Sequence, residues 1–406
     1  MEKTNKLPSV MMLLAALCFS IFLIYGIYFN IFGVDADVTM AFFEISESQQ
    51  GLIMTVQSVG SFIMTIILGL YGEKINKLKG LSIGAALVAI GGIAIGTIPK
   101  YMPQGSGYAL ILIYGLIGGI GYITIDLLMN GVISDVFPEN SHTLLPFVHA
   151  FFGTGAMIAP MLVSSLANPN KPQSFAVPFL IVGIAIAVVC IIFIFVCIRV
   201  MPSTPYADMT EIKKRVSENP AEIFKIKKAW FFLFACFLHV AFQNGLSLWL
   251  TSYCQKEMLI SYEKAAMMLS LFFVGNLSMR FLAPVIYRKI SVRNYYKIFI
   301  TAAAVVFFIF VLADLPLAVK YILIVLLGFL QGGGVPTLII ICCDAFPERS
   351  ASASSLFVFG VCLSSFIMPT LTGKMIELFG FLKPMIMLGV FLALSVVVLE
   401  FSKKFD

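Results

Sequence analysis

Long apolar stretches recur along the whole chain, and short polar segments separate them. A helix needs about 20 predominantly apolar residues to cross the hydrocarbon core of a bilayer. The pattern therefore predicts twelve membrane-spanning helices, with cores at 10–33, 51–71, 81–98, 108–133, 144–167, 176–198, 229–253, 265–287, 298–313, 321–341, 352–373 and 384–399. The ninth and twelfth cores are short, but Lys297 and Glu400 can snorkel and so extend them.

Composition supports a membrane protein and argues against an enzyme. Apolar residues make up 60% of the 406 residues and charged residues 12%, which is about half the charged fraction usual in soluble domains. The eight cysteines form no CxxC motif and have no histidine at a ligand spacing. We therefore predict no disulfide framework, no metal site and no cofactor, and we find no nucleophile–base pair that would indicate catalysis.

The distribution of basic residues predicts the orientation of the spans. Of the Lys and Arg residues, 20 lie in the termini and the loops after even-numbered spans, counting Arg280 near the end of span eight, and 7 lie on the other side. Basic residues concentrate on the cytoplasmic side of membrane proteins, so both termini are expected in the cytoplasm and the chain in the inner (cytoplasmic) membrane. The formal charge of +6 then faces anionic lipid headgroups and does not require nucleic acid as a partner.

An internal repeat divides the chain into two halves. Residues 134–141 read SDVFPENS and residues 343–350 read CDAFPERS, an offset of 209 that also relates Gly119 to Gly328. A second match, offset by 215, relates Val59-Gly60 to Val274-Gly275. The polar stretch 201–228 separates six spans from six. We therefore expect an all-α membrane protein with pseudo-symmetric six-helix halves at 1–200 and 229–406, joined by a cytoplasmic linker.

The loop GLYGEKINKLK (69–79) resembles the G-x-L-A-D-R-x-G-R-K signature of the major facilitator superfamily. Glu73 stands in the place of the aspartate, and Lys74 and Lys77 stand in the place of arginines. The resemblance implies the twelve-helix fold of that superfamily and alternating access by rocking of its two halves. It also implies that these three residues hold one conformational state through charge pairs.

Within the superfamily, the chain resembles the fucose/glucose permease branch, whose members are fucose, galactose or glucose:proton symporters. Spans four and five read GIGYITIDLLMN and HAFFGTGAMIAP, which is similar to the D-x-x-x-N and H-x-x-F-G-x-G-A-x-x-x-P patterns of that branch. Span seven reads HVAFQNGLSLWLTSY. The span-one carboxylate of the fucose permease is replaced here by Gly33, so the resemblance leaves proton coupling to Asp126.

Asp126 is the principal candidate for proton coupling. A carboxylate inside a membrane span is costly unless it is paired, hydrated or protonated, and it commonly marks a functional site. Asp126 precedes Pro138 by 12 residues and His149 follows it by 11, which predicts similar depths on two antiparallel helices. The alternative for His149 is a core histidine that packs the two spans. Asn130, one turn from Asp126, is expected to support this site.

Polar residues in other spans are candidates for contact with a substrate. Gln243 and Asn244 suit hydroxyl-rich ligands because amides both donate and accept hydrogen bonds, although they also join helices. Trp249 could stack on a sugar ring or belong to the interfacial aromatic belt. Further candidates along the predicted cavity are Gln57, Asn276, Gln331, Tyr28 and Asn30.

Arg280 lies in the cytoplasmic half of span eight. It could bind an anionic substrate, which would favour an organic-anion carrier. The alternative, which we prefer from the sequence, is a gating residue that pairs with a carboxylate or a helix end.

These features predict a secondary transporter, expected to be monomeric, that moves a small polar solute such as a sugar together with H+. One alternative is an exporter of drugs or amphiphilic metabolites, which the 38 Phe and 20 Met residues would suit. Another is an organic-anion carrier. A receptor or scaffold lacks support, because the chain has no soluble sensing domain.

Overall fold

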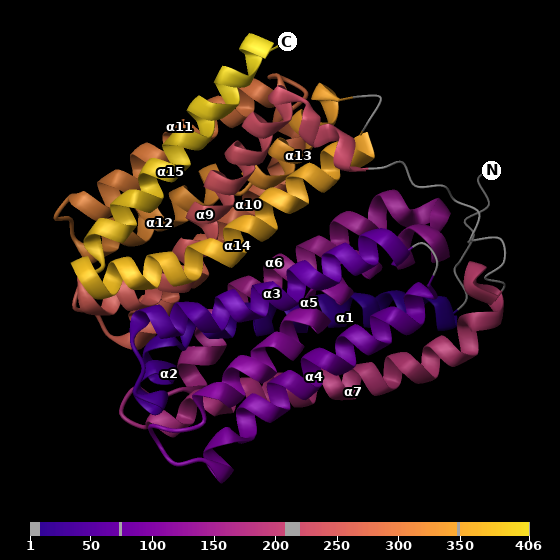
Figure 1. The fold of residues 1–406 in the computed structure, drawn as a ribbon, viewed down its shortest axis with the longest axis horizontal. Coiled ribbons are helices and arrows are strands. Elements are labelled where there is room, and N and C mark those ends of the chain that lie inside the picture. Colours follow the sequence, from indigo (N-terminus) through magenta and orange to yellow (C-terminus); the bar gives the residue numbers. More distant parts are fainter. Residues whose placement is uncertain (1–8, 73–74, 208–219, 347–349, 406) are drawn as a thin grey trace. The chain divides into compact units, whose positions relative to one another are not determined.

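The computed structural model describes residues 9–72, 75–207, 220–346 and 350–405 and is helical throughout these ranges apart from loops and one isolated bridge between Asn168 and Lys171. Within them, twelve helical segments are long and apolar enough to cross a membrane, which confirms the predicted spans. Figure 1 shows the helices α1 (Ser9–Val34), α2 (Ala36–Phe43), α3 (Glu47–Tyr71), α4 (Lys77–Tyr101), α5 (Tyr108–Val136), α6 (Ser141–Leu166), α7 (Ala176–Val200), α9 (Lys227–Lys256), α10 (Tyr262–Ile286), α11 (Val292–Leu312), α12 (Leu317–Gln331), α13 (Gly334–Ala345), α14 (Ser350–Phe379) and α15 (Leu382–Phe401).

The chain forms two compact units. Unit 1 comprises Met1–Phe29, Val56–Ala156 and Phe175–Val216, and unit 2 comprises Asn30–Thr55, Met157–Ser174 and Ser217–Asp406. Unit 2 thus includes the end of α1, all of α2 and the start of α3, together with every helix after the linker. Residues 208–219 of the linker lie outside the described residues, and the sequence-based division at 201–228 stays a prediction.

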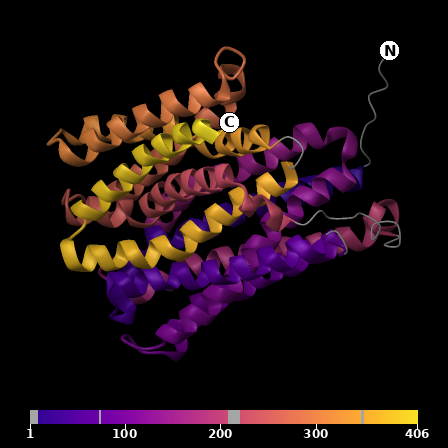
Figure 2. The same ribbon diagram turned by 45° about the horizontal axis from the view of Figure 1, so that its top comes forward.

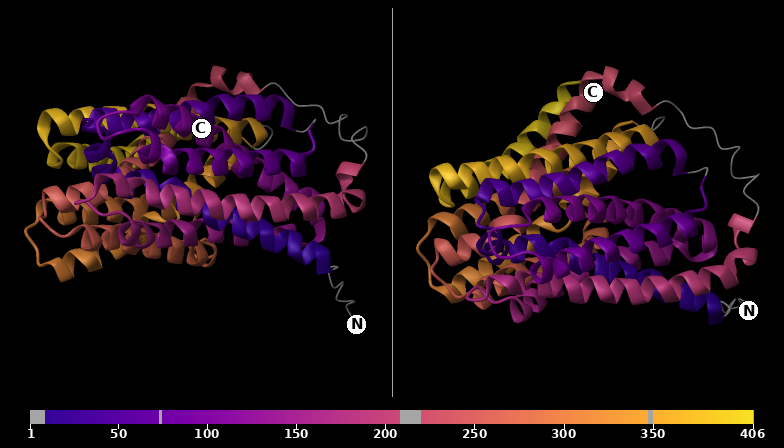
Figure 3. Two further views of the ribbon diagram at one scale, coloured as in Figure 1. Left: turned by 90° about the horizontal axis from the view of Figure 1, so that it is seen from below. Right: turned by 60° about the horizontal axis from the view of Figure 1, so that its bottom comes forward.

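In unit 1, α4 packs along both α5 and α7, as Figure 3 also shows. Glycines permit this close packing, because a Cβ at Gly92 would lie 3.0 Å from the Cα of Gly183. Helices in lipid gain little from apolar burial alone, so backbone approach at small residues becomes a main source of association.

One pair of glycines, Gly119 and Gly328, occupies equivalent places in the two units. A Cβ at Gly119 would collide with the carbonyl oxygen of Gln57, and a Cβ at Gly328 would collide with that of Phe272. These partners are related by the same two offsets that relate the sequence repeats, 209 and 215. The repeated motifs therefore make corresponding helix contacts, α3 with α5 in unit 1 and α10 with α12 in unit 2.

In unit 2, α9 packs against α14 and α15 (Figure 2), and α10 packs against α12. The tenth span is not one continuous helix, because α12 ends at Gln331 and α13 begins at Gly334. A Cβ at Gly332 would meet the backbone of Asn276, and one at Gly334 would meet the ring of His239. The glycine run in this span therefore leaves room for the α10 backbone at Asn276 and for the His239 side chain of α9.

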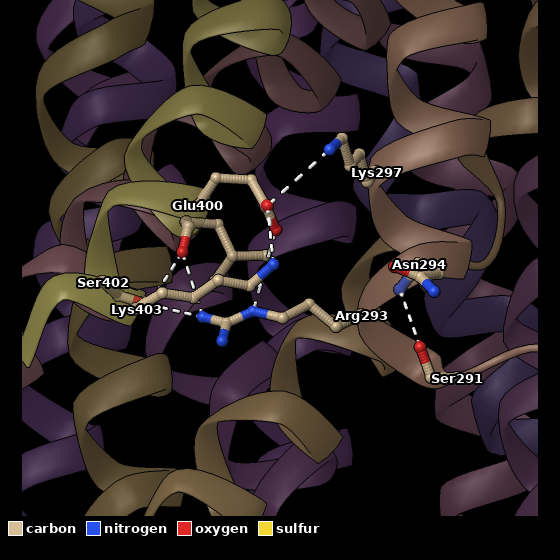
Figure 4. A network of polar contacts seen from close by, with 8 residues as sticks. Ser291, Arg293, Asn294, Lys297, Glu400, Ser402 and Lys403 are labelled. Atoms are coloured by element: carbon tan, nitrogen blue, oxygen red, sulfur yellow. Dashed lines mark hydrogen bonds and ion pairs between the residues drawn. The ribbon is translucent and has the colours of Figure 1, made fainter. Parts of the chain in front are cut away.

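An ion-pair network joins α11 to α15 (Figure 4). Glu400 lies 3.8 Å from Lys297 and 3.9 Å from Nε of Arg293, and Lys403 donates to it at 2.8 Å. Arg293 also donates to the carbonyl oxygen of Leu399 at 3.0 Å. These contacts fix the polar ends of the ninth and twelfth spans to each other.

Candidate functional site

Unit 1 holds a group of polar residues around Asp126, which we call the acid cluster: Tyr25, Asp126, Asn130 and His149. The Tyr25 hydroxyl donates a hydrogen bond to the Asp126 carboxylate, and His149 lies within electrostatic range of the same carboxylate. His149 Nε2 and Asn130 Oδ1 are 3.0 Å apart. Asn130 in turn donates to the backbone oxygen of Asp126 at 3.1 Å. The structure therefore brings together the three residues that the sequence predicted at similar depth, and adds Tyr25.

Aromatic rings surround the acid cluster. The Tyr25 ring, 1% exposed, packs against Tyr122 at 4.6 Å and against Phe152 at 5.0 Å between centroids. The Phe22 ring meets the His149 ring edge-on at 5.6 Å. Asp126 and His149 themselves are only half-buried, so a carboxyl group, an imidazole and a fixed hydroxyl lie in apolar surroundings while retaining access to solvent. This is an arrangement in which a carboxyl group can bind and release a proton.

Gln57 of α3 also belongs to unit 1 and is 3% exposed. Both polar atoms of its amide are buried and have no hydrogen-bond partner among the described residues. Buried amides are nearly always paired, so an unsatisfied one is a candidate for a ligand contact. Tyr28, fully buried, packs edge-on against Phe179 and lies over Gly118, which leaves room for its hydroxyl. Asn30, 5% exposed, falls in unit 2.

Unit 2 contains a longer chain of hydrogen bonds, which we call the amide network: His239, Gln243, Asn276, Arg280, Tyr296, Gln331 and Ser395. Arg280 Nε donates to Asn276 Oδ1 at 3.1 Å, and Asn276 Nδ2 donates to Gln331 Oε1 at 2.8 Å. The Gln331 amide nitrogen lies 3.3 Å from Gln243 Oε1 and 3.2 Å from His239 Nε2. The two predicted cavity residues Asn276 and Gln331 are thus bonded to each other and almost completely buried.

The directions of these bonds define the tautomer of His239. The two amide hydrogens of Gln331 go to Gln243 and to His239 Nε2, so that ring nitrogen accepts and Nδ1 carries the hydrogen. Nδ1 then donates to the Tyr296 hydroxyl at 3.1 Å, and Tyr296 donates to Ser395 at 2.9 Å. A neutral His239 therefore satisfies the buried middle of the network, from Gln331 to Ser395. Unlike the acid cluster, this part of the network has its donors matched to acceptors, and among the described residues donors are left over on Gln243 and Arg280, at its ends.

Gln243 and Asn244 are the half-exposed residues at the end of this arrangement. Asn244 donates to the Ser365 hydroxyl at 2.8 Å, which joins α9 to α14. Among the described residues nothing accepts a hydrogen bond from the Gln243 amide nitrogen, because only the Gln243 oxygen takes part in the bond with Gln331. Of the predicted amides in unit 2, Gln243 is thus the one with both exposure and free capacity.

The prediction that Trp249 offers a ring face, to a sugar or to the membrane interface, does not agree with its environment. The side chain is completely buried, and its indole N–H donates to the Thr372 hydroxyl at 3.0 Å. The ring also meets Phe381 edge-on at 6.1 Å between centroids. Trp249 here joins α9 to α14 as part of the packed interior.

The predicted gating residues differ in their contacts, and two of them lie outside the described part of the chain. Glu73 and Lys74 lie outside the described residues. Lys77, 5% exposed, forms an ion pair with Asp135 at 3.0 Å inside unit 1, and the Tyr206 hydroxyl donates to the same carboxylate at 2.8 Å. Arg280 has no carboxylate partner within 4.0 Å among the described residues and instead bonds to Asn276.

Sequence reasoning missed Tyr25, His239, Tyr296 and Ser395. His239 could have been identified as an ionisable residue in the middle of a span. The other three carry no signal in the sequence, because hydroxyl groups in apolar helices are common and only the packing selects them. Within the described residues, no group of three or more His, Cys, Asp or Glu side chains is placed to hold a metal ion.

The fold and these sites define a polytopic helical membrane protein with buried polar groups in its spans. The family model described as Major Facilitator Superfamily matches residues 10–369, and the chain belongs to that superfamily. It is 22% identical over 324 residues to the uncharacterized MFS-type transporter YfkL of Bacillus subtilis, which covers 77% of this chain and 76% of YfkL.

Solved structures show the same fold. A bacterial homolog of the human lysosomal transporter Spinster matches with a TM-score of 0.80 at 14% identity, over 98% of each chain. The fucose:proton symporter FucP of E. coli matches with a TM-score of 0.65 at 19% identity, over 97% of this chain and 99% of FucP. The family and its neighbours are transporters, not enzymes, so this chain is a membrane transporter of the superfamily. The fucose/glucose branch is not distinguished by these likenesses.

Proposed function

We propose that the protein moves a small neutral polyhydroxylated solute, a sugar or a close analogue, across the cytoplasmic membrane by alternating access and in symport with protons. The observation that carries this proposal is the acid cluster, in which a half-exposed Asp126 is held by Tyr25 and faced by His149. A titratable group that is set in apolar surroundings and still reached by solvent has the requirements of a proton carrier. The matching branch motifs around Asp126 support sugar as the solute class.

Two amides supply the solute contacts in this proposal. Gln57 in unit 1 has an unsatisfied buried amide, and Gln243 in unit 2 is half-exposed with a free donor. Hydroxyl groups both donate and accept, so they complement amides better than they complement charged groups. Asn130 and Asn276 take positioning roles, because their side chains are already bonded within the protein.

A second candidate function is an organic-anion carrier, and one observation favours it. Arg280 is half-exposed and lacks a carboxylate partner among the described residues. A guanidinium group with donors to spare recognises carboxylates well. The sequence analysis expected a carboxylate or a helix end of the protein to pair with Arg280. In this second candidate function, the carboxylate of an acidic substrate takes that place.

The first test is thermal unfolding of the detergent-purified protein with a panel of hexoses, deoxyhexoses, pentoses, dicarboxylates and cationic drugs. A ligand that binds the native state stabilises it by about 2.7 kcal/mol at a hundredfold excess over its dissociation constant. We expect a sugar to raise the melting temperature of the wild type and of Gln173→Ala, an exposed control. The shift should disappear in Gln243→Ala, measured against the ligand-free variant.

The panel separates the alternatives. A shift with dicarboxylates alone, lost in Arg280→Gln, would replace the sugar by an anion. A shift with cationic drugs alone would contradict both and favour an exporter. A sugar-induced shift that survives in Gln243→Ala would remove Gln243 from the binding site.

A further inference from the structure

The segment Asn30–Thr55 of unit 2 packs closely on α9 and α14. A Cβ at Gly33 would lie 2.9 Å from the Cα of Leu248, and a Cβ at Gly51 would collide with the backbone of Pro369. Thr55 donates to the carbonyl oxygen of Phe366 at 3.0 Å. This segment connects the first two spans on the side that the charge pattern assigns to the outside, so its contacts close that side of unit 2.

Two carboxyl groups are enclosed by this packing. Asp35 is completely buried, and neither of its carboxylate oxygens has a hydrogen-bond partner among the described residues. Asp37, two residues later, accepts a hydrogen bond from Gln255 of α9 at 2.7 Å through Oδ2, while the same part of the chain supplies no partner to its buried Oδ1. An ionised carboxylate without donors is among the most costly groups to bury. Asp35 is such a group, and a bound proton would remove its charge and supply a donor.

The Tyr262 side chain of α10 provides an independent sign of an unsatisfied site. It is 5% exposed, its buried hydroxyl has no hydrogen-bond partner within the described ranges, and it lies within electrostatic range of both Asp35 and Asp37. Tyr262 also lines a pocket of about 740 Å³. The other residues of that pocket are mostly polar and come from the end of α6, the segment that follows it and the start of α10; they include Asn168, Lys171, Ser261 and Glu263.

We propose that Asp35 and Asp37 form a second proton-binding site, distinct from Asp126, which holds a proton while Asn30–Thr55 is packed on α9 and exchanges it with the outside through the pocket at Tyr262. The ligand is H+, shared by the two carboxyl groups. Release of that proton leaves an uncompensated negative charge between Asn30–Thr55 and α9, and so favours separation of this segment from α9. External pH thereby controls whether the segment stays packed on α9.

The charges around the pair do not replace the proton. Lys256 of α9 is the cation that acts on Asp37, but it is exposed and therefore screened by solvent. Glu47 of α3 acts on Asp37 in the opposite sense, and Glu263 of α10 acts on Tyr262.

Burial raises the pKa of Asp35 well above its usual value, and the neighbouring Asp37 raises it further. Burial also raises the pKa of Asp37, against the opposing effects of Lys256, Ser252 and Gln255.

This arrangement predicts a definite pH dependence of stability. The folded protein keeps a proton on the pair at pH values where the unfolded chain has released it, above about pH 4. The stability that this proton contributes is therefore fully present below that pH, and it is lost as the pH rises through the folded-state pKa of the pair. Asp35→Asn is neutral at every pH and should remove this loss.

The test is the melting temperature of the purified full chain between pH 5 and pH 9 at constant ionic strength, without any substrate. We expect Asp35→Asn to match the wild type at pH 5 and to exceed it by about 2 °C or more at pH 8. The control Asp314→Asn changes an exposed outer-loop aspartate and should follow the wild type throughout. Because no substrate is needed, the result does not depend on the proposed sugar transport.

Two outcomes would overturn the proposal. In the first, folded Asp35→Asn and wild type lose stability in parallel as the pH rises. If Asp35→Asn does not fold, Asp37→Asn serves as the second variant, and a parallel loss there overturns the proposal equally. In the second, replacing choline chloride by sodium chloride at pH 8 raises the melting temperature of the wild type but not of the variant, which would assign the pair to a metal cation instead of a proton.

Discussion

The acid cluster of unit 1 and the amide network of unit 2 are both polar groups within apolar helices, but they are built differently. Asp126 and His149 are titratable and half-buried, and the Tyr25 hydroxyl donates directly to the carboxylate. In the amide network, by contrast, His239 and Gln331 are buried and fully bonded. A loosely held acid can change its protonation state, whereas a satisfied network specifies one geometry. We infer that unit 1 binds and releases the proton and that the amide network of unit 2 fixes the position of Gln243.

The largest effect that this contrast predicts is on stability. Gln331→Leu removes three hydrogen bonds at once and leaves His239 Nε2, Gln243 Oε1 and Asn276 Nδ2 without the partner that Gln331 provides. Hydrogen bonds between membrane helices contribute about 0.6 kcal/mol on average and up to about 1.7, so we expect a loss of about 2–4 kcal/mol, measured by unfolding in detergent. The matched control Gln173→Leu changes an exposed loop glutamine and should be close to neutral. Equal stability of the two variants would contradict a specifying network.

A smaller effect is expected when Tyr25 is changed to Phe. The substitution keeps the ring packed against Tyr122 and Phe152 but removes the hydroxyl that donates to Asp126. That bond stabilises the ionised carboxylate, so its loss of about 1 kcal/mol should move the pH profile of coupled transport toward alkaline values by up to roughly one unit.

Solute uptake in proteoliposomes, measured across a series of pH values, would show this shift. Tyr114→Phe is the control, because Tyr114 lies on α5, the helix of Asp126, but does not belong to the acid cluster. An unchanged profile in Tyr25→Phe, or the same shift in Tyr114→Phe, would remove Tyr25 from the proton site.

The sequence predicted the spans and part of the acid cluster for clear physical reasons. Apolar length defines a membrane helix, and counting residues from Pro138 on two antiparallel helices placed Asp126 and His149 at one depth. The internal repeat likewise predicted two pseudo-symmetric halves, and the structure shows that its glycines Gly119 and Gly328 make equivalent contacts in the two units. These inferences need only the distance of a residue along its helix, because a short connection such as the turn at Pro138 already makes the two helices antiparallel neighbours.

The partners across helices could not be predicted in this way. Asn276 and Gln331 were identified as separate cavity residues, yet they bond to each other at 2.8 Å, because the rotation of α10 against α12 decides which faces meet. The burial of Trp249 under Thr372 has the same cause. The enclosure of Asp35 by α9 depends on contacts between segments more than 200 residues apart, as the Asp37–Gln255 bond shows.

The most direct test of the central claim measures proton movement with the solute that the stability panel identifies. Proteoliposomes that contain a pH-sensitive dye would report internal acidification when the solute is added outside. We predict that Asp126→Asn lowers solute-driven acidification at least tenfold while it retains exchange of labelled solute across the membrane, because binding and rocking do not need the proton. Solute-driven acidification at the wild-type rate in Asp126→Asn would contradict the assignment of the proton to the acid cluster.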